Sequence, residues 1–463
     1  MRRLSASFAL TLFLLVVTAG QDRKTVTVGN ATASRGQKVT GTIEVPPGVD
    51  AGLSIPVAVV HGTMPGPVLA LVAGSHGTEY TSIIALEKLI AMLDPAKISG
   101  TVIIVPLINI QSFEQKVPHV NPVDKKSMNR FYPGKMDGSQ TERASYLITK
   151  QVVEQCDHLI DLHGGDLDES LRPYSYWTRT GNEKQDQISR EMVLAFGLDH
   201  IIISTERPKD PQASRYLENT ATTRGKPSIT AEAGYAGTVE TDDLNALING
   251  CLSVMRYLKM LPGQVSMVER PVWLEKVVTL ASEQTGMFYP VVRRGTYVEQ
   301  GMKVGYVTDY VGKVIFEARA PVAGVVLYVC AVPSMTKGAT IANIGVIASP
   351  QQAQTRFAYH FGGTVSESDG RALPRMNVCV IPAERPINGR IPCMKTADNG
   401  SFDITVNDIP DKYKVCASTK ESPFILSPNN DPSHRVVCSA SIALPERDDS
   451  RKVDLKFEAV QQP

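Results

Sequence analysis

Apolar runs of strand length alternate with helical apolar patterns over residues 55–260, and this alternation constrains the fold more than any other sequence feature. The candidate strands are residues 55–60, 68–73, 102–108, 159–162, 201–204 and 229–231. Between them, apolar residues recur at three- and four-residue steps in 83–93 and 147–153, which is the period of an amphipathic helix. Alternating strands and helices predict an α/β domain with a mostly parallel mixed sheet. Because ligands bind at the carboxyl ends of strands in such sheets, we look for functional residues there.

The pattern changes near Pro271, beyond which short β-rich segments are separated by glycines and no helical periodicity remains. A polar stretch that starts at Ser349 precedes a third unit with Asp-Gly and Asn-Gly turn signals. A chain of 463 residues is long enough for several domains. We therefore predict an α/β catalytic domain at 21–268, a small β-barrel at 269–350 and an all-β sandwich at 351–463.

Residues 1–20 have the pattern of a secretory signal peptide. Two arginines precede an apolar core at 8–17, and small residues follow at 18–20. The apolar run is shorter than the ~20 residues that a membrane span needs, which favours a cleaved signal over an anchor helix. We expect a secreted or periplasmic protein that does not span the membrane after cleavage. The sequence leaves the oligomeric state open.

The overall charge balance bears on the possible partners. The chain has 48 Lys and Arg residues against 47 Asp and Glu residues. Such a balance gives no electrostatic attraction to phosphate backbones or anionic lipid, so nucleic acid is not expected as a partner.

The cysteines agree with an extracytoplasmic location. Four of the seven lie in the last quarter of the chain, at Cys379, Cys393, Cys416 and Cys438. Four cysteines in one such module predict two disulfides, and all three pairings remain open. Cys156, Cys251 and Cys330 are scattered, and we expect them to be small buried apolar residues.

Three residues at predicted strand ends have the spacing of a metal site. His76 and Glu79 lie between the strand at 68–73 and the following helix, and His163 ends the strand at 159–162. Two nearby ligands and one distant ligand are typical of a catalytic zinc site with water in the fourth position. Asp161 is expected on the same side of its strand as His163, where it could accept the second ring N–H of a histidine ligand or remain a solvated aspartate. A loop histidine beside a glutamate in the first turn of a helix remains the alternative for the first pair.

Four motifs, in order, resemble the succinylglutamate desuccinylase/aspartoacylase family of zinc-carboxypeptidase-like deacylases. They are Gly74-Ser-His-Gly-Thr-Glu79, Asn129-Arg-Phe-Tyr-Pro-Gly134, Asp161-Leu-His163 and Thr230-Ala-Glu-Ala-Gly234. The resemblance covers about residues 55–260 and implies one Zn²⁺ per chain, held by His76, Glu79 and His163. It also implies that Glu232 is the general base, and that a barrel resembling biotinyl/lipoyl carriers follows.

Substrate binding is assigned to three residues near the second motif. Arg130 offers a planar fork for a substrate carboxylate, and Asn129 offers an amide donor beside it. Because Pro133-Gly134 follows, an ordinary surface turn remains the alternative for both residues. The family's Asp-Leu-Asn-Arg is Ser127-Met128-Asn129-Arg130 in this chain, so an acidic residue is missing. His119 stands near the place where relatives often have an arginine that steadies the oxyanion. It is compatible with an electrophile, a substrate contact or an ordinary loop histidine.

These residues predict a secreted or periplasmic zinc-dependent amidohydrolase that cleaves a small carboxylate-bearing substrate, such as an N-acyl amino acid. A metallocarboxypeptidase that trims peptides or cell-wall stems is the first alternative, and a non-catalytic binding protein is the second. The acyl group and the amine of the substrate remain open. The third unit resembles a carboxypeptidase regulatory-like sandwich, and we expect a stabilising or spacing role for it.

Overall fold

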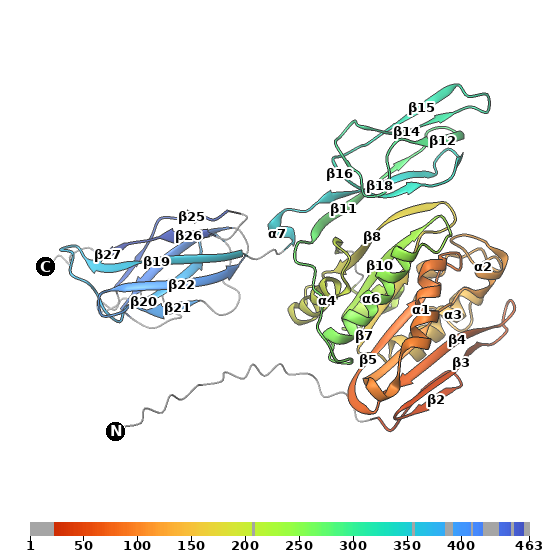
Figure 1. The fold of residues 1–463 in the computed structure, drawn as a ribbon, viewed down its shortest axis with the longest axis horizontal. Coiled ribbons are helices and arrows are strands. Elements are labelled where there is room, and N and C mark those ends of the chain that lie inside the picture. Colours follow the sequence, from red (N-terminus) through yellow and green to blue (C-terminus); the bar gives the residue numbers. More distant parts are fainter. Residues whose placement is uncertain are drawn as a thin grey trace. The chain divides into compact units, whose positions relative to one another are not determined.

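The computed structural model describes residues 23–205, 209–353, 357–384, 392–408, 411–419, 435–445 and 449–457. The chain divides into two compact units, with the boundary in the sequence between Ile347 and Ala348 (Figure 1). The predicted signal peptide at 1–20 lies outside the described residues. Within the described part of the chain, no helix is long and apolar enough to cross a membrane.

A twelve-stranded mixed sheet runs through the first unit (Figure 1). Its strands in spatial order are β13 (Tyr297–Val298), β16 (Gly324–Cys330), β18 (Thr340–Ile347), β11 (Val272–Ala281), β9 (His200–Ser204), β8 (Glu169–Thr178), β10 (Ser228–Tyr235), β7 (His158–His163), β5 (Met64–Ala73), β6 (Ser99–Val105), β4 (Leu53–His61) and β3 (Gln37–Val45). The neighbours β10, β7, β5 and β6 run parallel, whereas β8 runs antiparallel to β10. A short hairpin of β1 (Thr25–Val28) and β2 (Ala31–Ser34) precedes this sheet.

Helices cover both faces of the central strands, as the alternating sequence pattern predicts. Helices α1 (Tyr80–Met92), α4 (Glu183–Phe196) and α6 (Thr241–Tyr257) pack together over one face. Helices α3 (Gln140–Ile148) and α5 (Leu217–Thr222) share a core with the opposite face, and α2 (Ile110–Gln115) follows β6. On β5, Val68, Ala70 and Val72 join that second core. The residues between them are also buried, so β5 is apolar on both sides, as a central parallel strand requires.

The β-rich segment after Pro271 is continuous with the α/β part. Strand β11 pairs in parallel with β9, and β16 pairs with both β18 and β8, so these strands extend the main sheet. A second sheet, in the order β15 (Val314–Arg319), β14 (Lys303–Thr308), β12 (Gly286–Pro290) and β17 (Ser334–Met335), belongs to the same segment. Phe288, Val304 and Val326 share one core with Leu171 of β8. The segment expected as a separate domain at 269–350 is therefore part of one compact unit with the α/β part up to Ile347.

The second unit is also β-rich, as expected, and α7 (Pro350–Ala353) opens it. One sheet contains β19 (Phe357–Glu367), β22 (Ser401–Asp408), β26 (Asp449–Lys452) and β27 (Leu455–Phe457). The other contains β20 (Asn377–Pro382), β21 (Cys393–Lys395), β23 (Lys412–Ser418), β24 (Val436–Cys438) and β25 (Ile442–Ala443). Residues of both sheets, among them Phe361 and Val380, form one apolar core.

The cysteine predictions are confirmed. Cys379 bonds to Cys393 and Cys416 bonds to Cys438, each pair joining neighbouring strands of the second unit. The three scattered cysteines are free thiols and are buried. The structure thus selects one of the three pairings that the sequence left open.

Candidate active site

The loop between β5 and α1 positions His76 and Glu79. Gly74 directly follows β5 and has a φ of +69°, and a Cβ there would lie 2.8 Å from Cα of Leu107. A Cβ on Gly77 would lie 2.5 Å from the carbonyl oxygen of Asn109. Both glycines are therefore needed, because the loop packs against the backbone that follows β6. The loop delivers Glu79 to the N-cap position of α1.

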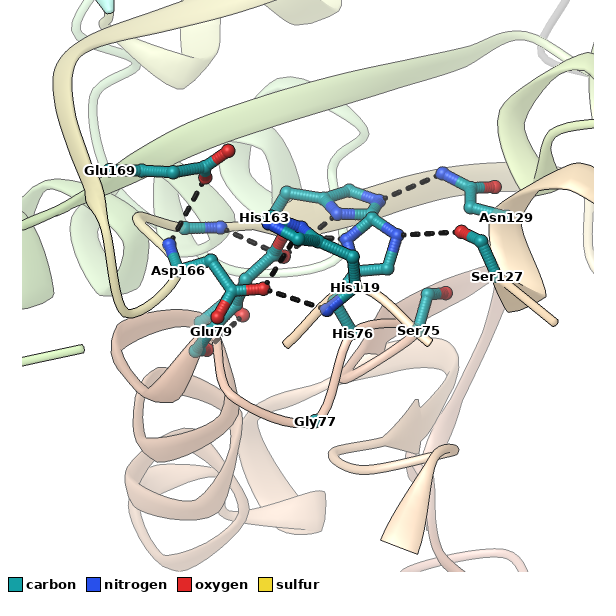
Figure 2. A network of polar contacts seen from close by, with 12 residues as sticks. Ser75, His76, Gly77, Glu79, His119, Ser127, Asn129, His163, Asp166 and Glu169 are labelled. Carbon is teal, nitrogen blue, oxygen red and sulfur yellow. Dashed lines mark hydrogen bonds and ion pairs between the residues drawn. The ribbon is translucent and has the colours of Figure 1, made fainter. Parts of the chain in front are cut away.

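His76, Glu79 and His163 converge, as the sequence predicts. The Nδ1 atoms of His76 and His163 lie 2.6 Å and 2.9 Å from the two carboxylate oxygens of Glu79 (Figure 2). One ligand atom from each of the three residues lies within 4.8 Å of the others. Burial opposes ionisation of Glu79, but the two imidazoles lower its pKa well below the usual value. Two ring nitrogens and a carboxylate oxygen form a donor set that zinc prefers, so the residues present fit this ion.

The Nε2 atom of each imidazole also has a polar neighbour. Nε2 of His76 lies 3.3 Å from the hydroxyl of Ser127. Nε2 of His163 lies 3.2 Å from Oδ1 of Asp161, which is 1% exposed. These contacts leave both Nδ1 atoms directed at the common point near Glu79, an arrangement that fixes the ligand orientation. Asp161 lies where the strand alternation predicts.

Glu232 lies beside this cluster. On the parallel strands β10 and β7, Glu232 is the direct partner of His163. The side chain is partly buried in the wall of a cavity that the three candidate ligands also line. Burial raises the pKa of Glu232 well above its usual value, and the nearby carboxylates of Glu79 and Glu169 add to this effect. A carboxyl group with a raised pKa is suited to accept and return a proton near neutral pH.

His119 lies at the same cavity with a left-handed backbone, at φ 61°. The buried carboxylate of Asp166 accepts a hydrogen bond from the backbone N–H of His119 and lies 3.1 Å from its Nδ1. The Asp168 carboxylate, aided by Asp166 and Glu169, raises the pKa of His119 to about 9 despite partial burial. The ring is therefore cationic at neutral pH, and its centre is 6.1 Å from that of His76.

Asn129 and Arg130 both line the cavity but face different partners. Oδ1 of Asn129 accepts from the backbone N–H of Leu217 at 2.9 Å, and Nδ2 lies 3.2 Å from Nε2 of His163 (Figure 2). The Arg130 guanidinium is exposed and stacks over the ring of Tyr216 at 4.8 Å. Arg130 is thus the freer of the two to meet a substrate carboxylate.

The cavity has a volume of about 410 Å³ and contains every predicted site residue. Its wall also includes residues that the sequence did not single out: Tyr174, Tyr176, Thr178, Ser204, Tyr216, Glu218, Asn219, Tyr328 and Asn343. Tyr328 and Asn343 come from β16 and β18, so the β-rich segment forms part of the wall. No local motif marks Tyr328 and Asn343, because the long-range pairing of β16 with β8 and β18 brings them to the site.

The sequence model of the succinylglutamate desuccinylase/aspartoacylase catalytic domain matches residues 65–258. This segment belongs to the succinylglutamate desuccinylase/aspartoacylase family. The matched residues include the loop of His76 and Glu79, the strand end with His163, and Glu232. The candidate site therefore lies entirely within the matched segment, apart from the wall that β16 and β18 supply.

Known relatives of the family share sequence or fold with this chain. An N-alpha-acetyl-L-2,4-diaminobutyric acid deacetylase from Halomonas elongata is 29% identical over 299 residues, which are 63% of this chain and 86% of that protein. A succinylglutamate desuccinylase/aspartoacylase from Rhodobacter sphaeroides has a TM-score of 0.60 at 21% identity, over 67% of this chain and 96% of its own. The ectoine utilization protein EutE from Ruegeria pomeroyi has a TM-score of 0.61 at 23% identity, over 71% and 98% of the two chains. At these identities, the two structures show a shared fold.

Proposed function

We propose that the protein is a zinc-dependent deacylase that hydrolyses the amide bond of small N-acyl amino acids. The observation that carries this proposal is the convergence of His76, Glu79 and His163 within 4.8 Å, with Glu232 on the adjacent strand. The family of the matched segment supports the reaction type. The relative from Halomonas elongata, named as a deacetylase of an acetylated amino acid, supports the substrate class.

His76, Glu79 and His163 would hold the zinc ion. A zinc ion in such a site polarises the scissile carbonyl and lowers the pKa of water toward ~7. Glu79 is suited to this role because its lowered pKa keeps it ionised at neutral pH. Asp161 and Ser127 fix the two imidazoles so that Nδ1 of each remains available.

Glu232 acts as the proton carrier. Its carboxylate takes one proton from the attacking water, and the hydroxyl group adds to the amide carbon. The carboxyl group then gives this proton to the amine nitrogen as the C–N bond breaks. The products are a carboxylic acid and a free amino acid, so atoms and protons balance.

Arg130 binds the free carboxylate of the substrate through parallel N–H bonds. Stacking on Tyr216 supports the guanidinium plane, and its Nη1 also donates to the carbonyl oxygen of Asn129 at 2.6 Å. Asn129 is held in the wall of the site because its Oδ1 accepts a hydrogen bond from the backbone N–H of Leu217. His119, cationic at the cavity wall, is assigned to contact with the acyl part of the substrate.

A small substrate is favoured over a peptide because the cavity is walled on the side of the β-rich segment. Tyr328 and Asn343 belong to the lining, and they lie on strands that are continuous with the main sheet. A wall built into the sheet leaves less room for a long chain than an open groove does. This feature separates the deacylase proposal from the carboxypeptidase alternative.

The location and the β-rich segments complete the proposal. We propose that the protein acts outside the cytosol, which the pattern of residues 1–20 and the two disulfides support. The segment at 269–350 is assigned a barrel-like role in closing the site. The unit at 351–463 is assigned the role of a regulatory-like sandwich without catalytic residues.

A substrate screen with and without a chelator tests the proposal. The zinc-loaded protein should release amino acids from N-acetyl amino acids, and the chelator should abolish this activity. A pentapeptide with the same C-terminal residue should be cleaved much more slowly. Faster cleavage of the pentapeptide would replace the deacylase assignment with the carboxypeptidase one.

A further inference from the structure

The cavity has a second set of polar residues on the same sheet face as Glu232 and His163. Thr230 precedes Glu232 by two residues in β10, and it pairs with Asp161 of β7. Side chains two residues apart on a strand point to the same face of the sheet. Thr230 therefore shares a face with Glu232, and Asp161 shares it with His163. We call this part of the cavity the side-chain pocket; its residues are Asp161, Thr178, Ser204, Glu218, Asn219 and Thr230.

Glu218 of α5 is a buried acid at this pocket. It is 4% exposed. Its Oε2 accepts a hydrogen bond from Nδ2 of Asn219 at 2.9 Å, and its Oε1 lies 3.4 Å from the hydroxyl of Ser228. Among the described residues, its hydrogen-bond partners are Asn219, Ser228 and Thr178, which are all neutral. Burial raises the pKa of Glu218 to about 7, because its neutral partners offset little of the cost of a buried charge. A positively charged ligand beside it would stabilise the ionised form.

Asp161 provides a second, independent sign of a missing partner. It is 1% exposed and lines the cavity. Its Oδ1 lies near His163, but among the described residues its Oδ2 has no hydrogen-bond partner. Buried carboxylate oxygens are nearly always paired in folded proteins, so this one is expected to receive a donor from a ligand or from water.

The position of the two acids suits the side chain of an amino acid. Ser228, which contacts Glu218, precedes Glu232 by four residues in β10. At ~3.3 Å per residue, Ser228 lies roughly 13 Å along β10 from Glu232, so the Glu218 carboxyl group that it contacts lies toward that end of the strand. Asp161 lies about halfway down, opposite Thr230. An amino acid whose carboxylate meets Arg130 at the exposed rim can therefore extend its side chain past Asp161 toward Glu218.

We propose that the side-chain pocket selects N-acyl amino acids whose side chain ends in a positive charge, and that Glu218 is the specificity-determining residue. This inference rests on the proposed deacylase function and names its substrate class. A neutral side chain would leave the ionised carboxylate of Glu218 desolvated without an ionic partner. An acidic side chain would be repelled by it.

The first test compares substrates on the zinc-loaded wild-type protein. The cationic series consists of the Nα-acetyl derivatives of 2,4-diaminobutyrate, ornithine and lysine. The controls are acetylated norvaline and norleucine, which are neutral and of similar length, and acetylated glutamate. We expect kcat/KM for the best cationic substrate to exceed that of each control at least ~10-fold, the value of one charge-assisted hydrogen bond. Equal or higher values for the neutral substrates would overturn the inference.

The second test uses Glu218→Gln, which keeps the shape of the side chain. The ratio of kcat/KM for cationic over neutral substrates should fall about 10- to 100-fold. Exposed Glu87 of α1 gives a matched control, and Glu87→Gln should keep the wild-type ratio. An unchanged ratio in Glu218→Gln would refute the role of this residue.

Product binding gives a readout that does not depend on turnover. Calorimetry on the wild-type protein should show tighter binding of free ornithine than of norvaline, and this measurement holds even if Glu218→Gln fails to fold. Equal binding of the two amino acids would contradict the inference. If no N-acyl amino acid is hydrolysed at all, the proposed function fails; if hydrolysis occurs without cation preference, only this inference fails.

Discussion

Replacing Glu232 by glutamine tests the assignment of the proton carrier. Glutamine keeps the size of the side chain but cannot accept a proton. Glu232 pairs with His163 across two parallel strands, so its carboxyl group stands beside the candidate metal ligands. Positioned acid–base catalysis contributes ~10²–10⁴ in rate, or roughly 3–5 kcal/mol of transition-state stabilisation.

A second carboxyl group in the cavity narrows the range of rate loss expected for Glu232→Gln. Glu169 lines the same cavity, and burial together with Glu79 raises its pKa to about 7. A second carboxyl group of this kind can carry part of the proton transfer, so we expect a loss of kcat of ~10²–10³ rather than the upper limit. The double variant with Glu169→Gln should then lose more than Glu232→Gln alone.

The assay measures release of the free amino acid from an N-acetyl amino acid, together with zinc content and thermal unfolding. Zinc content should stay at one per chain, because Glu232 is not among the three converging ligands. Thermal stability should not fall, because glutamine keeps the size of the side chain and stays neutral where burial and the nearby carboxylates disfavour a negative charge. The exposed Glu299 serves as the control, and Glu299→Gln should behave as wild type. A kcat within fivefold of wild type in Glu232→Gln, with zinc bound, would refute the assignment.

Three further predictions concern the metal, the fold and the second unit. His163→Ala should lose zinc, measured by elemental analysis, because two remaining ligands retain the ion poorly; full zinc content would contradict the ligand set. Although partial burial opposes it, hydrogen bonds from Lys126 and Ser139 lower the pKa of Glu142 to about 2. The stability that Glu142 contributes is therefore present above pH 4.5 and is lost as the pH falls toward 2. Glu142→Gln should lower the free energy of unfolding by about 1–2 kcal/mol at pH 7, and denaturant titrations should show a weaker dependence of its stability on acid. The two disulfides join cysteines 14 and 22 residues apart, and reduction of each should destabilise the second unit by about 3 kcal/mol in calorimetry. Deacylase activity should remain after reduction. Loss of activity would show that the two units are coupled.

The candidate ligands could be predicted from sequence because their signal is local. His76 and Glu79 are three residues apart after an apolar strand, and His163 ends another such strand. In an α/β sheet, strand ends meet at one edge, so local patterns were enough to expect convergence. The role of Glu232 needed the family resemblance, because a glutamate at a strand end is common by itself.

Other parts of the site depend on contacts that no local pattern encodes. Glu218 reaches the cavity only because α5 packs over β7 and β10. Tyr328 reaches it because β16 pairs with β8, some 160 residues earlier in the chain, as in the partner pair Tyr328 and Leu171. Pairing at such sequence distance is set by packing of the whole unit, so the β-rich segment was expected as a separate domain although its strands extend the main sheet.

The central claim is that three converging residues hold a zinc ion for hydrolysis of N-acyl amino acids. The most direct measurement is a titration of zinc into the metal-free protein, with binding and release of amino acid from an N-acetyl amino acid followed in the same sample. Activity should rise in proportion to bound zinc and reach its maximum at one ion per chain. Full activity in the metal-free protein, or one bound zinc per chain without hydrolysis of any N-acyl amino acid, would contradict it.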